Sequence, residues 1–495
     1  MSSKIIFWID RTITEFGIAK YLQDKAEHEL SAIYEMTDKP KEFFERQKLV
    51  VFKKQWFYFD HVQERNKTPD LEYLKNIEEK YGINIWLLAY NDRIFYNYNE
   101  YHRFTTNEVL SIIEQECRFF ESVLDSLNPD YLITHDTYSQ PHRLFYLMCK
   151  AKGITILLMA PSRVGNLYEI TDESDKFRSL EDVGGDYPEI KMQPLEFLES
   201  TKTDTLKNYT NVVENSKKDF FHAGSKFWFS DNSKEKKFYT YFGRTKIRVL
   251  VKTISYQLKI KFREYFMNRN LPMQLDTSLP FLYFPLHMEQ ESAMLIGAPF
   301  YLDQIAIIKN VAKSLPIGYK LVVKDHFVMK SRGWRSIKEC KEIMNLPNVI
   351  LMNPLSDGKD ILKKCSLVIA VKGTSSIEAA FHMKPSIVFE NSGSYHLPSV
   401  HKITSFHELP IAIRNSLKEK VKTEDLKKYV NVISKNSFLY QSVELEIAIQ
   451  QRFNFGGYLA DGIYPHATNE MEKFLTDFKS QFEFLVSEYM KKIKD

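Results

Sequence analysis

Cysteine is scarce in this chain of 495 residues, and the four that occur lie far apart. Cys117, Cys149, Cys340 and Cys365 form no CxxC pair, so the sequence predicts neither a disulfide framework nor a zinc site and fits a reducing compartment. Glycine is also sparse, no internal repeat is visible, and no apolar run approaches the roughly 18 residues of a membrane span. The apolar stretch before Asp10 is too short for a signal peptide, so we expect a first strand there and a cytoplasmic protein.

The motifs of several common enzyme classes are missing as well. The chain contains no GxGxxG, no GxxxxGK[ST], no GxSxG and no HExxH, which leaves dinucleotide, P-loop, serine hydrolase and zinc protease chemistry without support. It also lacks a DxD triplet, the usual carboxylate pair for a divalent metal that holds a nucleotide diphosphate. We therefore expect no metal and no cofactor. The net charge of +4 carries no nucleic-acid-like excess, so any basic function must be local.

What the chain does contain is enough apolar and aromatic sequence for more than one core: 44% of its residues are hydrophobic and 14% are aromatic. Strand-like and helix-like segments alternate twice, which is typical of parallel βαβ units. In the first half we expect strands at 4–9, 83–88, 131–134 and 154–159, an apolar run at 49–57, helices at 107–127 and 144–150, and a loop with Thr12, Thr14 and Gly17 before a helix through Leu22. In the second half we expect strands at 281–286, 319–324, 348–352, 367–371 and 386–389, helices at 301–315, 336–344, 359–364 and 375–383, and a long final helix at 469–491.

This alternation predicts an α/β fold with two Rossmann-like domains facing a cleft. We expect a first α/β domain at 1–200 and a basic helical insert or linker at 201–278. A second α/β domain would follow at 279–465, and a helix at 466–495 would cross back onto the first domain.

The segment 367–391 is the most informative stretch. An apolar strand ends at Gly373, Thr374, Ser375 and Ser376 offer N-cap hydroxyls, and a helix follows. Such a turn directs backbone N–H groups and the positive end of the helix dipole toward one point, which suits a phosphate. Glu378, one turn into the helix, would meet a sugar hydroxyl of the same ligand. The alternative is an ordinary βαβ turn with a routine N-cap.

Other polar residues follow predicted strands, where open parallel sheets bind ligands. In the second half these are His287 and Glu291 after one strand and Lys324 and His326 after the next. Lys324 and His326 would bind a phosphate and offset the charge of a leaving group. Each histidine could instead be an ordinary surface residue.

The first half offers Asp10 and Arg11, the pair His135 and Asp136, and Arg163 at its strand ends, with Glu15 in the first loop. A carboxylate or imidazole among them would act as general base toward an acceptor hydroxyl. Neighbours on a strand point to opposite faces, so we expect only one of His135 and Asp136 to reach the cleft. An N-cap role for Asp136 is the competing interpretation.

The stretch 234–263 contains ten lysine or arginine residues and one acid, Glu235. Apolar residues recur within it at helical spacing, which predicts a basic amphipathic helix. Two interpretations stay open: a helix docked by its apolar face with a solvated basic face, or a helix lying on an anionic membrane surface or cradling an anionic acceptor.

Five segments together resemble GT-B glycosyltransferases, in particular the capsule and surface polysaccharide group related to bacterial Kdo and sialic acid transferases. The segments are YFPLHMEQES (283–292), LVVKDH (321–326), GTSSIEAAFHMKPSIVF (373–389), PDYLITHD (129–136) and KGITILLMAPSR (152–163). The resemblance implies a donor nucleotide on the second domain, an acceptor glycan or glycolipid on the first, no bound metal, and work at the inner face of the plasma membrane. In this group a histidine followed by proline often contacts the donor phosphate, whereas His326 is followed by Phe327.

We therefore expect a glycosyltransferase that moves a sugar from a nucleotide-sugar donor, possibly CMP-linked, to a surface polysaccharide or glycolipid. His135, Asp136 and His326 are the expected catalytic residues. The alternatives are a GT-B-shaped sugar-nucleotide epimerase, a polyol-phosphate transferase, and a non-catalytic partner in capsule assembly.

Overall fold

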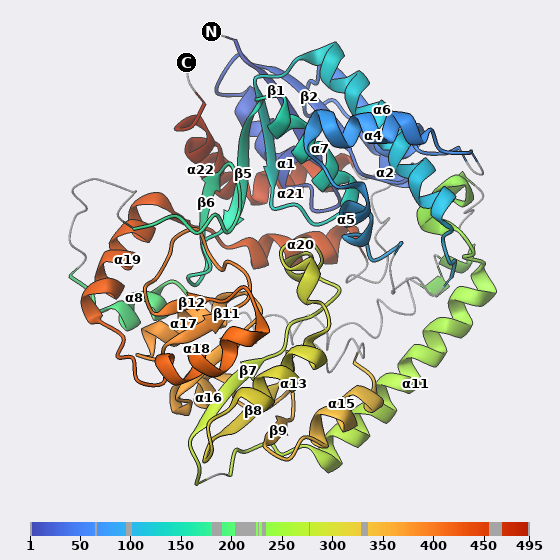
Figure 1. Cartoon of the computed structure of the whole chain (residues 1–495). Coiled ribbons are helices and arrows are strands. Elements are labelled where there is room, and N and C mark those ends of the chain that lie inside the picture. Colours follow the sequence, from blue (N-terminus) through green and yellow to red (C-terminus); the bar gives the residue numbers. More distant parts are fainter. Residues whose placement is uncertain are drawn as a thin grey trace.

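The computed structural model describes residues 2–64, 67–95, 101–180, 191–202, 224–225, 227–229, 234–276, 278–327, 335–454 and 468–493. Its strands form two sheets, one in each half of the molecule (Figure 1). The expected fold class, an α/β fold with two Rossmann-like domains, is confirmed. The expected insert at 201–278 is only partly tested, since 203–223, 226, 230–233 and 277 lie outside the described residues.

The first sheet has seven strands in the order β13-β6-β5-β4-β1-β2-β3. They are β1 (Lys4–Ile9), β2 (Glu29–Tyr34), β3 (Lys54–Phe57), β4 (Tyr131–His135), β5 (Thr155–Pro161), β6 (Leu167–Thr171) and β13 (Phe438–Leu439). Strands β1 to β5 pair in parallel, and β6 and β13 add an antiparallel edge. Because β1 lies between β2 and β4 and pairs with both in parallel, the carboxyl ends of these three strands lie at the same edge of the sheet.

Helices cover both faces of the first sheet. One face packs against α1 (Thr14–Gln23), α2 (Asp38–Arg46), α20 (Ser442–Phe453), α21 (Thr468–Asp477) and α22 (Lys479–Met490). The other packs against α3 (Tyr58–His61), α4 (Leu71–Tyr81), α5 (Ile85–Tyr90), α6 (Thr106–Leu127), α7 (Gln140–Ala151) and the 3₁₀ turn η2 (Tyr239–Tyr241). Helix α6 begins with a capping box in which Thr105 and Glu108 exchange hydrogen bonds.

The second sheet has six strands, all parallel, in the order β12-β11-β10-β7-β8-β9. They are β7 (Phe281–Pro285), β8 (Lys320–Lys324), β9 (Val349–Met352), β10 (Leu367–Ala370), β11 (Ser386–Val388) and β12 (Val400–Lys402). The helices around it are α8 (Pro194–Ser200), α12 (Ser292–Leu295), α13 (Gln304–Ser314), α15 (Ile337–Met344), α16 (Gly358–Lys364), α17 (Thr374–Phe381), α18 (Leu409–Ser416) and α19 (Thr423–Asn436), with 3₁₀ turns η3 (Pro299–Tyr301) and η4 (Phe406–Glu408). The 3₁₀ turn η1 (Lys234–Lys237) instead contacts η2 on the side of the first sheet. Strand β10 is buried throughout, as expected where helices cover both faces of a sheet.

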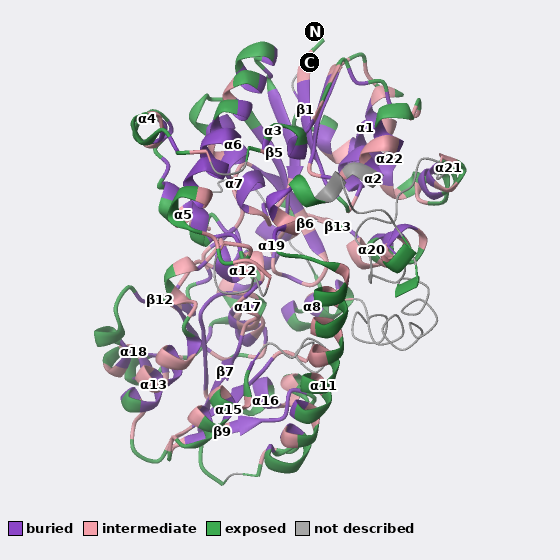
Figure 2. Cartoon of the chain, turned by 90° about the vertical axis from the view of Figure 1, so that its right-hand side faces the viewer, coloured by how far each residue is buried: buried purple, intermediate pink, exposed green. Residues whose placement is uncertain are grey.

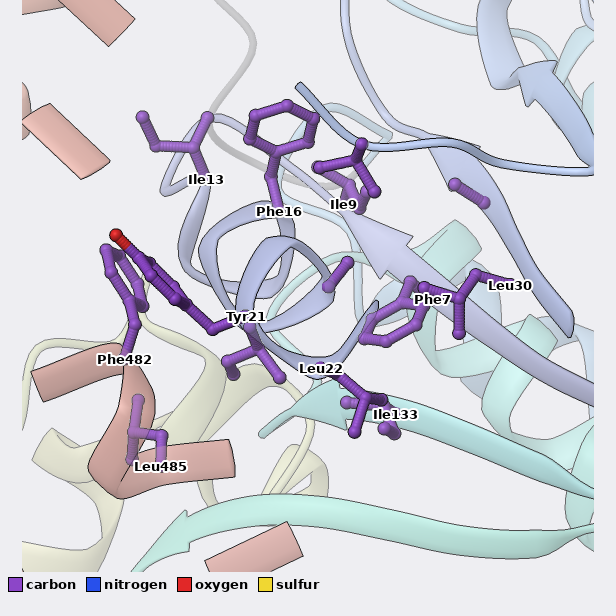
Figure 3. Packing of buried hydrophobic residues seen from close by; sticks show 14 of the residues in the cluster. Phe7, Ile9, Ile13, Phe16, Tyr21, Leu22, Leu30, Ile133, Phe482 and Leu485 are labelled. Atoms are coloured by element: carbon purple, nitrogen blue, oxygen red, sulfur yellow. The ribbon is translucent and has the colours of Figure 1, made fainter. Parts of the chain in front are cut away.

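The C-terminal segment packs against the first helix of the chain (Figure 1). Tyr21 of α1 stacks on Phe482 of α22 with ring centroids 6.0 Å apart, and its hydroxyl donates to the carbonyl of Leu475 at 2.8 Å (Figure 3). Gly17 lies under Phe482, where a Cβ would overlap the ring. The expected loop position of Thr14 and Gly17 is therefore wrong: both belong to α1, and Gly17 serves this packing.

Three other expectations on the elements need correction. The final helix, expected at 469–491, is interrupted at Phe478 and forms α21 and α22. The chain rejoins the first sheet at β13, ahead of the expected position 466. The segment 83–88, expected as a strand, gives the start of helix α5, whose N-cap Asn84 accepts from the backbone N–H of Leu87 at 2.7 Å.

Helix α11 (Lys246–Asn270) runs along the outside of the molecule and is exposed along much of its length (Figure 2). Of its residues only Arg263 and Met267 are buried. The expected apolar face, Ile247, Leu250, Val251, Ile254, Leu258 and Phe262, is exposed. The interpretation of a helix docked by that face is therefore wrong. No helix among the described residues is long and apolar enough to cross a membrane.

Candidate functional site

Three neighbouring strands of the second sheet end in cationic or imidazole side chains. His287 follows β7, Lys324 ends β8 and Lys372 follows β10. Gln304 of α13 fixes the His287 backbone through two hydrogen bonds of 2.8 and 2.9 Å, and the His287 Nε2 accepts from the backbone N–H of Lys372 at 3.5 Å. Burial, with the nearby His326 and Arg163, lowers the pKa of His287 to about 4, so the ring is neutral at neutral pH.

The amino end of α17 begins beside His287. Gly373 has φ 107, in the region that favours glycine, and a Cβ there would lie 3.1 Å from the His287 Cε1. Its N–H donates to the Ser392 Oγ at 2.7 Å, and the Ser376 Oγ donates to its carbonyl at 2.8 Å. No side chain caps the helix, and Thr374 and Ser375 in its first turn are not buried. The turn therefore presents backbone N–H groups beside Lys372 and His287, as a phosphate site requires.

The remaining donor-side residues are engaged in different ways. Lys324 is buried, which lowers its pKa, and its ammonium group donates to the carbonyl of Asp325 at 3.3 Å. The His326 ring lies against Phe327 with centroids 4.5 Å apart. Glu291 occupies the N-cap position of the short helix α12 without a side-chain capping bond and is partly exposed. Glu378, expected to meet a sugar hydroxyl, forms an ion pair with Lys202 at 2.8 Å.

A buried ion cluster joins the two halves of the molecule at this point. Arg163, which follows β5, donates to both carboxylate oxygens of Asp175 at 3.0 and 2.8 Å, and Lys372 pairs with the same carboxylate at 2.8 Å. The backbone N–H of Gly393 adds a fourth contact at 2.7 Å. Burial alone would raise the pKa of Asp175, but Arg163 and Lys372 hold it well below its usual value. Arg163, expected on the acceptor side, is thus connected through the Asp175 carboxylate to Lys372 at the strand ends of the second sheet.

On the first sheet the side chains of His135 and Asp136 diverge, as expected for neighbours on a strand. The His135 Nδ1 lies 2.8 Å from the Glu15 Oε1, and its Nε2 lies 3.7 Å from the Asp10 Oδ2. Burial lowers the pKa of His135, but Glu15 and Asp10 outweigh it and raise the pKa to about 10. Asp136 instead accepts from the Ser174 Oγ at 2.9 Å and contributes to the raised pKa of Arg163. Asp136 is therefore the one that faces the Arg163 side.

Two further residues of this edge need mention. Arg11, expected at the acceptor site, is exposed. Glu35, which follows β2, was not expected: its Oε2 accepts from Trp8, Tyr138 and Ser139, and burial with the nearby Asp10 raises its pKa to about 7. The strand-end rule would have found Glu35 if strand β2 had been recognised in the sequence.

Comparison with known proteins gives similarity at the level of structure alone. No family model and no curated protein matches the chain. Among solved structures, UDP-GlcNAc 2-epimerase from Neisseria meningitidis bound to UDP-GlcNAc is 14% identical with a TM-score of 0.27, covering 86% of this chain and 93% of its own. S. aureus MnaA with UDP is 10% identical with a TM-score of 0.29, covering 92% and 97%.

KpsC from Thermosulfurimonas dismutans, a beta Kdo 2,7 transferase, is 11% identical with a TM-score of 0.29, covering 63% of this chain and 79% of its own. These proteins belong to the transferase and epimerase classes that the sequence analysis names. At such identities and TM-scores the similarities carry no argument about activity, so the case for function rests on the site.

Proposed function

We propose that this protein is a glycosyltransferase that moves a sugar from a nucleotide-sugar donor to a glycan or lipid-linked acceptor. One observation carries the proposal. The uncapped amino end of α17, Lys372 and His287 converge at the strand ends of the second sheet, and the Arg163–Asp175–Lys372 cluster holds this group against the strand ends of the first. A phosphate-binding turn on one domain and a carboxylate at the strand ends of the other would together supply what transfer to a hydroxyl requires.

The donor phosphates bind at the first turn of α17, where the N–H groups of Thr374 to Ser376 and the helix dipole favour an anion. As the acceptor oxygen attacks the anomeric carbon, the bond from that carbon to the phosphate oxygen breaks and the nucleotide leaves with its charge. Lys324, His326 and Lys372 offset that charge.

Asp136 accepts the acceptor hydroxyl proton. His135 is the weaker choice for this role, because its Nδ1 is engaged by the Glu15 Oε1 at 2.8 Å and its Nε2 lies 3.7 Å from the Asp10 Oδ2. The proposal therefore selects one of the two residues that the sequence left open.

The test separates donor binding from transfer. A thermal-shift screen with CMP, UDP, GDP and CDP identifies the nucleotide, because a ligand that binds the native state alone raises the melting temperature. With the matching sugar nucleotide, Asp136→Asn is expected to keep the thermal shift and to lose about 10²–10⁴ in transfer rate. Ser174→Ala, which removes the hydroxyl bonded to Asp136, is the control and is expected to retain most of the activity. Full transfer by Asp136→Asn would contradict the assignment, and a chain that no nucleotide stabilises would be a non-catalytic partner.

A sugar-nucleotide epimerase is the second candidate, favoured by Glu35. With a pKa of about 7, this carboxyl is able to give and take a proton near neutral pH, as an epimerase acid or base must. The two activities are distinguished by incubating the chain with the sugar nucleotide alone and following the sugar protons by NMR. If the sugar nucleotide is isomerised in the absence of an acceptor, the protein is an epimerase. If the sugar nucleotide stays unchanged, the transferase assignment is retained.

The proposal includes an anionic membrane surface as a partner, bound through α11. Its apolar stripe is exposed, with Ile254, Leu258 and Phe262 at 53%, 63% and 67%. The helix also carries seven basic residues and one acid, so two copies of this face would repel each other, whereas an anionic bilayer offers both apolar depth and opposite charge.

Vesicle co-sedimentation tests this partner. We expect binding to vesicles with anionic lipid, weaker binding to neutral ones, and loss of binding in Leu258→Glu with Phe262→Glu. The control is Ile317→Glu, which places one glutamate at a fully exposed apolar residue outside α11. Equal binding by the double variant and the control would refute the role of α11.

A further inference from the structure

Three polar side chains lie close together at the strand ends of the first sheet. The proposed function assigns no role to the atoms through which they approach one another. Asp10 follows β1, Glu15 lies in the first turn of α1, and His135 ends β4, the strand paired with β1. One oxygen or nitrogen from each lies within 4.8 Å of the others. The chain thus brings two carboxylates and an imidazole to one point.

Printed contacts hold Asp10 and His135 in place within this cluster. Thr12 donates from its backbone N–H at 2.8 Å and from its hydroxyl at 2.5 Å to the Asp10 Oδ1, which leaves the Oδ2 toward His135. The Glu15 Oε1 takes the His135 Nδ1, which fixes the ring and turns the Nε2 toward Asp10.

Each of the three side chains has one polar atom without a hydrogen-bond partner among the described residues. These atoms are the Asp10 Oδ2, the Glu15 Oε2 and the His135 Nε2. Asp10 and Glu15 are 1% and 0% exposed, so water offers these oxygens little compensation. Leaving a buried polar group without a hydrogen bond costs about 1–3 kcal/mol of folding free energy. Three such groups close together indicate that they share a binding partner.

We propose that Asp10, Glu15 and His135 bind one divalent transition-metal cation of the Mn²⁺ or Zn²⁺ class. The mixed oxygen and nitrogen set suits these ions better than Mg²⁺ or Ca²⁺, which prefer oxygen ligands alone. Two carboxylates balance the charge of a dication, and three protein ligands leave coordination positions open. Of the three side chains, His135 is the most exposed, at 19%. The missing DxD bears on the usual carboxylate pair for a metal that holds a donor diphosphate and does not concern this site.

The experiment measures metal binding directly, so its result is independent of transfer activity. The chain is stripped with a chelator and titrated with Mn²⁺ while the free ion is followed by electron paramagnetic resonance. Wild type is expected to bind one Mn²⁺ per chain, and Asp10→Asn and Glu15→Gln are expected to lose affinity by at least about tenfold. The histidine ligand is read from the nitrogen modulation of the bound Mn²⁺, which is expected to disappear in His135→Gln.

The matched control is Glu116→Gln, a buried carboxylate of the same domain whose two oxygens already accept from Tyr58 and Gln140. It is expected to bind Mn²⁺ like wild type. Folding of each variant is checked by circular dichroism, and Mn²⁺ and Zn²⁺ are expected to raise the melting temperature of wild type and control alone. Absence of Mn²⁺ and Zn²⁺ binding by wild type, or undiminished binding by folded Asp10→Asn and Glu15→Gln, would overturn the proposal and leave a buried ion cluster.

Discussion

Replacing Asp175 by Asn tests the ion cluster that joins the two halves of the molecule. Asn has the same shape and tolerates the positive φ of 52 at this position, so the substitution removes charge with little change to the backbone. The exposed fractions of the Asp175, Arg163 and Lys372 side chains are 4%, 16% and 10%, so two buried cations would lose their counter-charge. Removing one partner of a buried pair costs about 3–5 kcal/mol, which is the loss we expect in the free energy of unfolding.

Urea denaturation followed by circular dichroism and tryptophan fluorescence measures this loss, with both probes recorded because a chain of two domains need not unfold in one step. Adding Lys372→Met to Asp175→Asn removes one of the two cations that have lost their counter-charge. The double variant is therefore expected to be more stable than the sum of the two single losses predicts, by about 1 kcal/mol or more. A loss under about 1 kcal/mol in Asp175→Asn, or strict additivity with Lys372→Met, would refute the argument from buried charge.

The pH dependence gives a second check on the same residue. Arg163 and Lys372 depress the pKa of folded Asp175, so the unfolded chain takes up its proton first as the pH falls. The stabilisation is therefore complete above the ordinary value of about 4 and is lost as the pH falls below it. The difference between wild type and Asp175→Asn is expected to be constant from neutral pH to about 5 and to shrink below about 4. A stability difference between wild type and Asp175→Asn that grows as the pH falls would contradict the expected direction of the pKa shift.

Two further outcomes are expected from other residues. Burial raises the pKa of Glu116 to about 8, so its folded form keeps a proton that the unfolded chain releases, and the associated stability is lost as the pH rises through about 8. Between pH 5 and 9 the free energy of unfolding of Glu116→Gln is therefore expected to rise relative to that of wild type, by up to about 4 kcal/mol in urea denaturation. A difference between the two proteins that does not change with pH would contradict this expectation. Gly373→Ala places a Cβ at φ 107 and 3.1 Å from the His287 ring, so we expect a loss of about 1–2 kcal/mol and weaker nucleotide binding by thermal shift. Gly358→Ala, whose Cβ meets nothing closer than 3.6 Å, is expected to stay within about 0.5 kcal/mol, and similar losses in both variants would remove the special role of Gly373.

The sequence was sufficient where a strand is a short apolar run with turn residues at its ends. Strands β4 and β10 were found in this way, and with them the placement of Asp136 and Gly373 at strand ends. It failed where the local pattern was weak or ambiguous. Strand β2, with the sequence ELSAIY, contains Glu29 and Ser31 and was missed, so Glu35 was missed too.

Helix α5, with the sequence IWLLAY, was taken for a strand. A short apolar run without period-2 or period-3.6 spacing does not distinguish a buried strand from a buried helix. The cap at Asn84 was the local signal that would have favoured the helix.

By itself, then, the sequence determined the α/β fold, most strand ends, and the residue types available at each of them. Only the tertiary structure decided which of these residues meet. The pairing of Asp175 with Lys372, the direction in which His135 turns, and the outward position of the α11 apolar stripe all depend on contacts between segments far apart in the chain or on their absence. Periodicity records which face of an element is apolar, but not which distant segment covers it. For that reason the sequence placed His135 at a strand end, and the fold supplied Asp10 and Glu15 beside it.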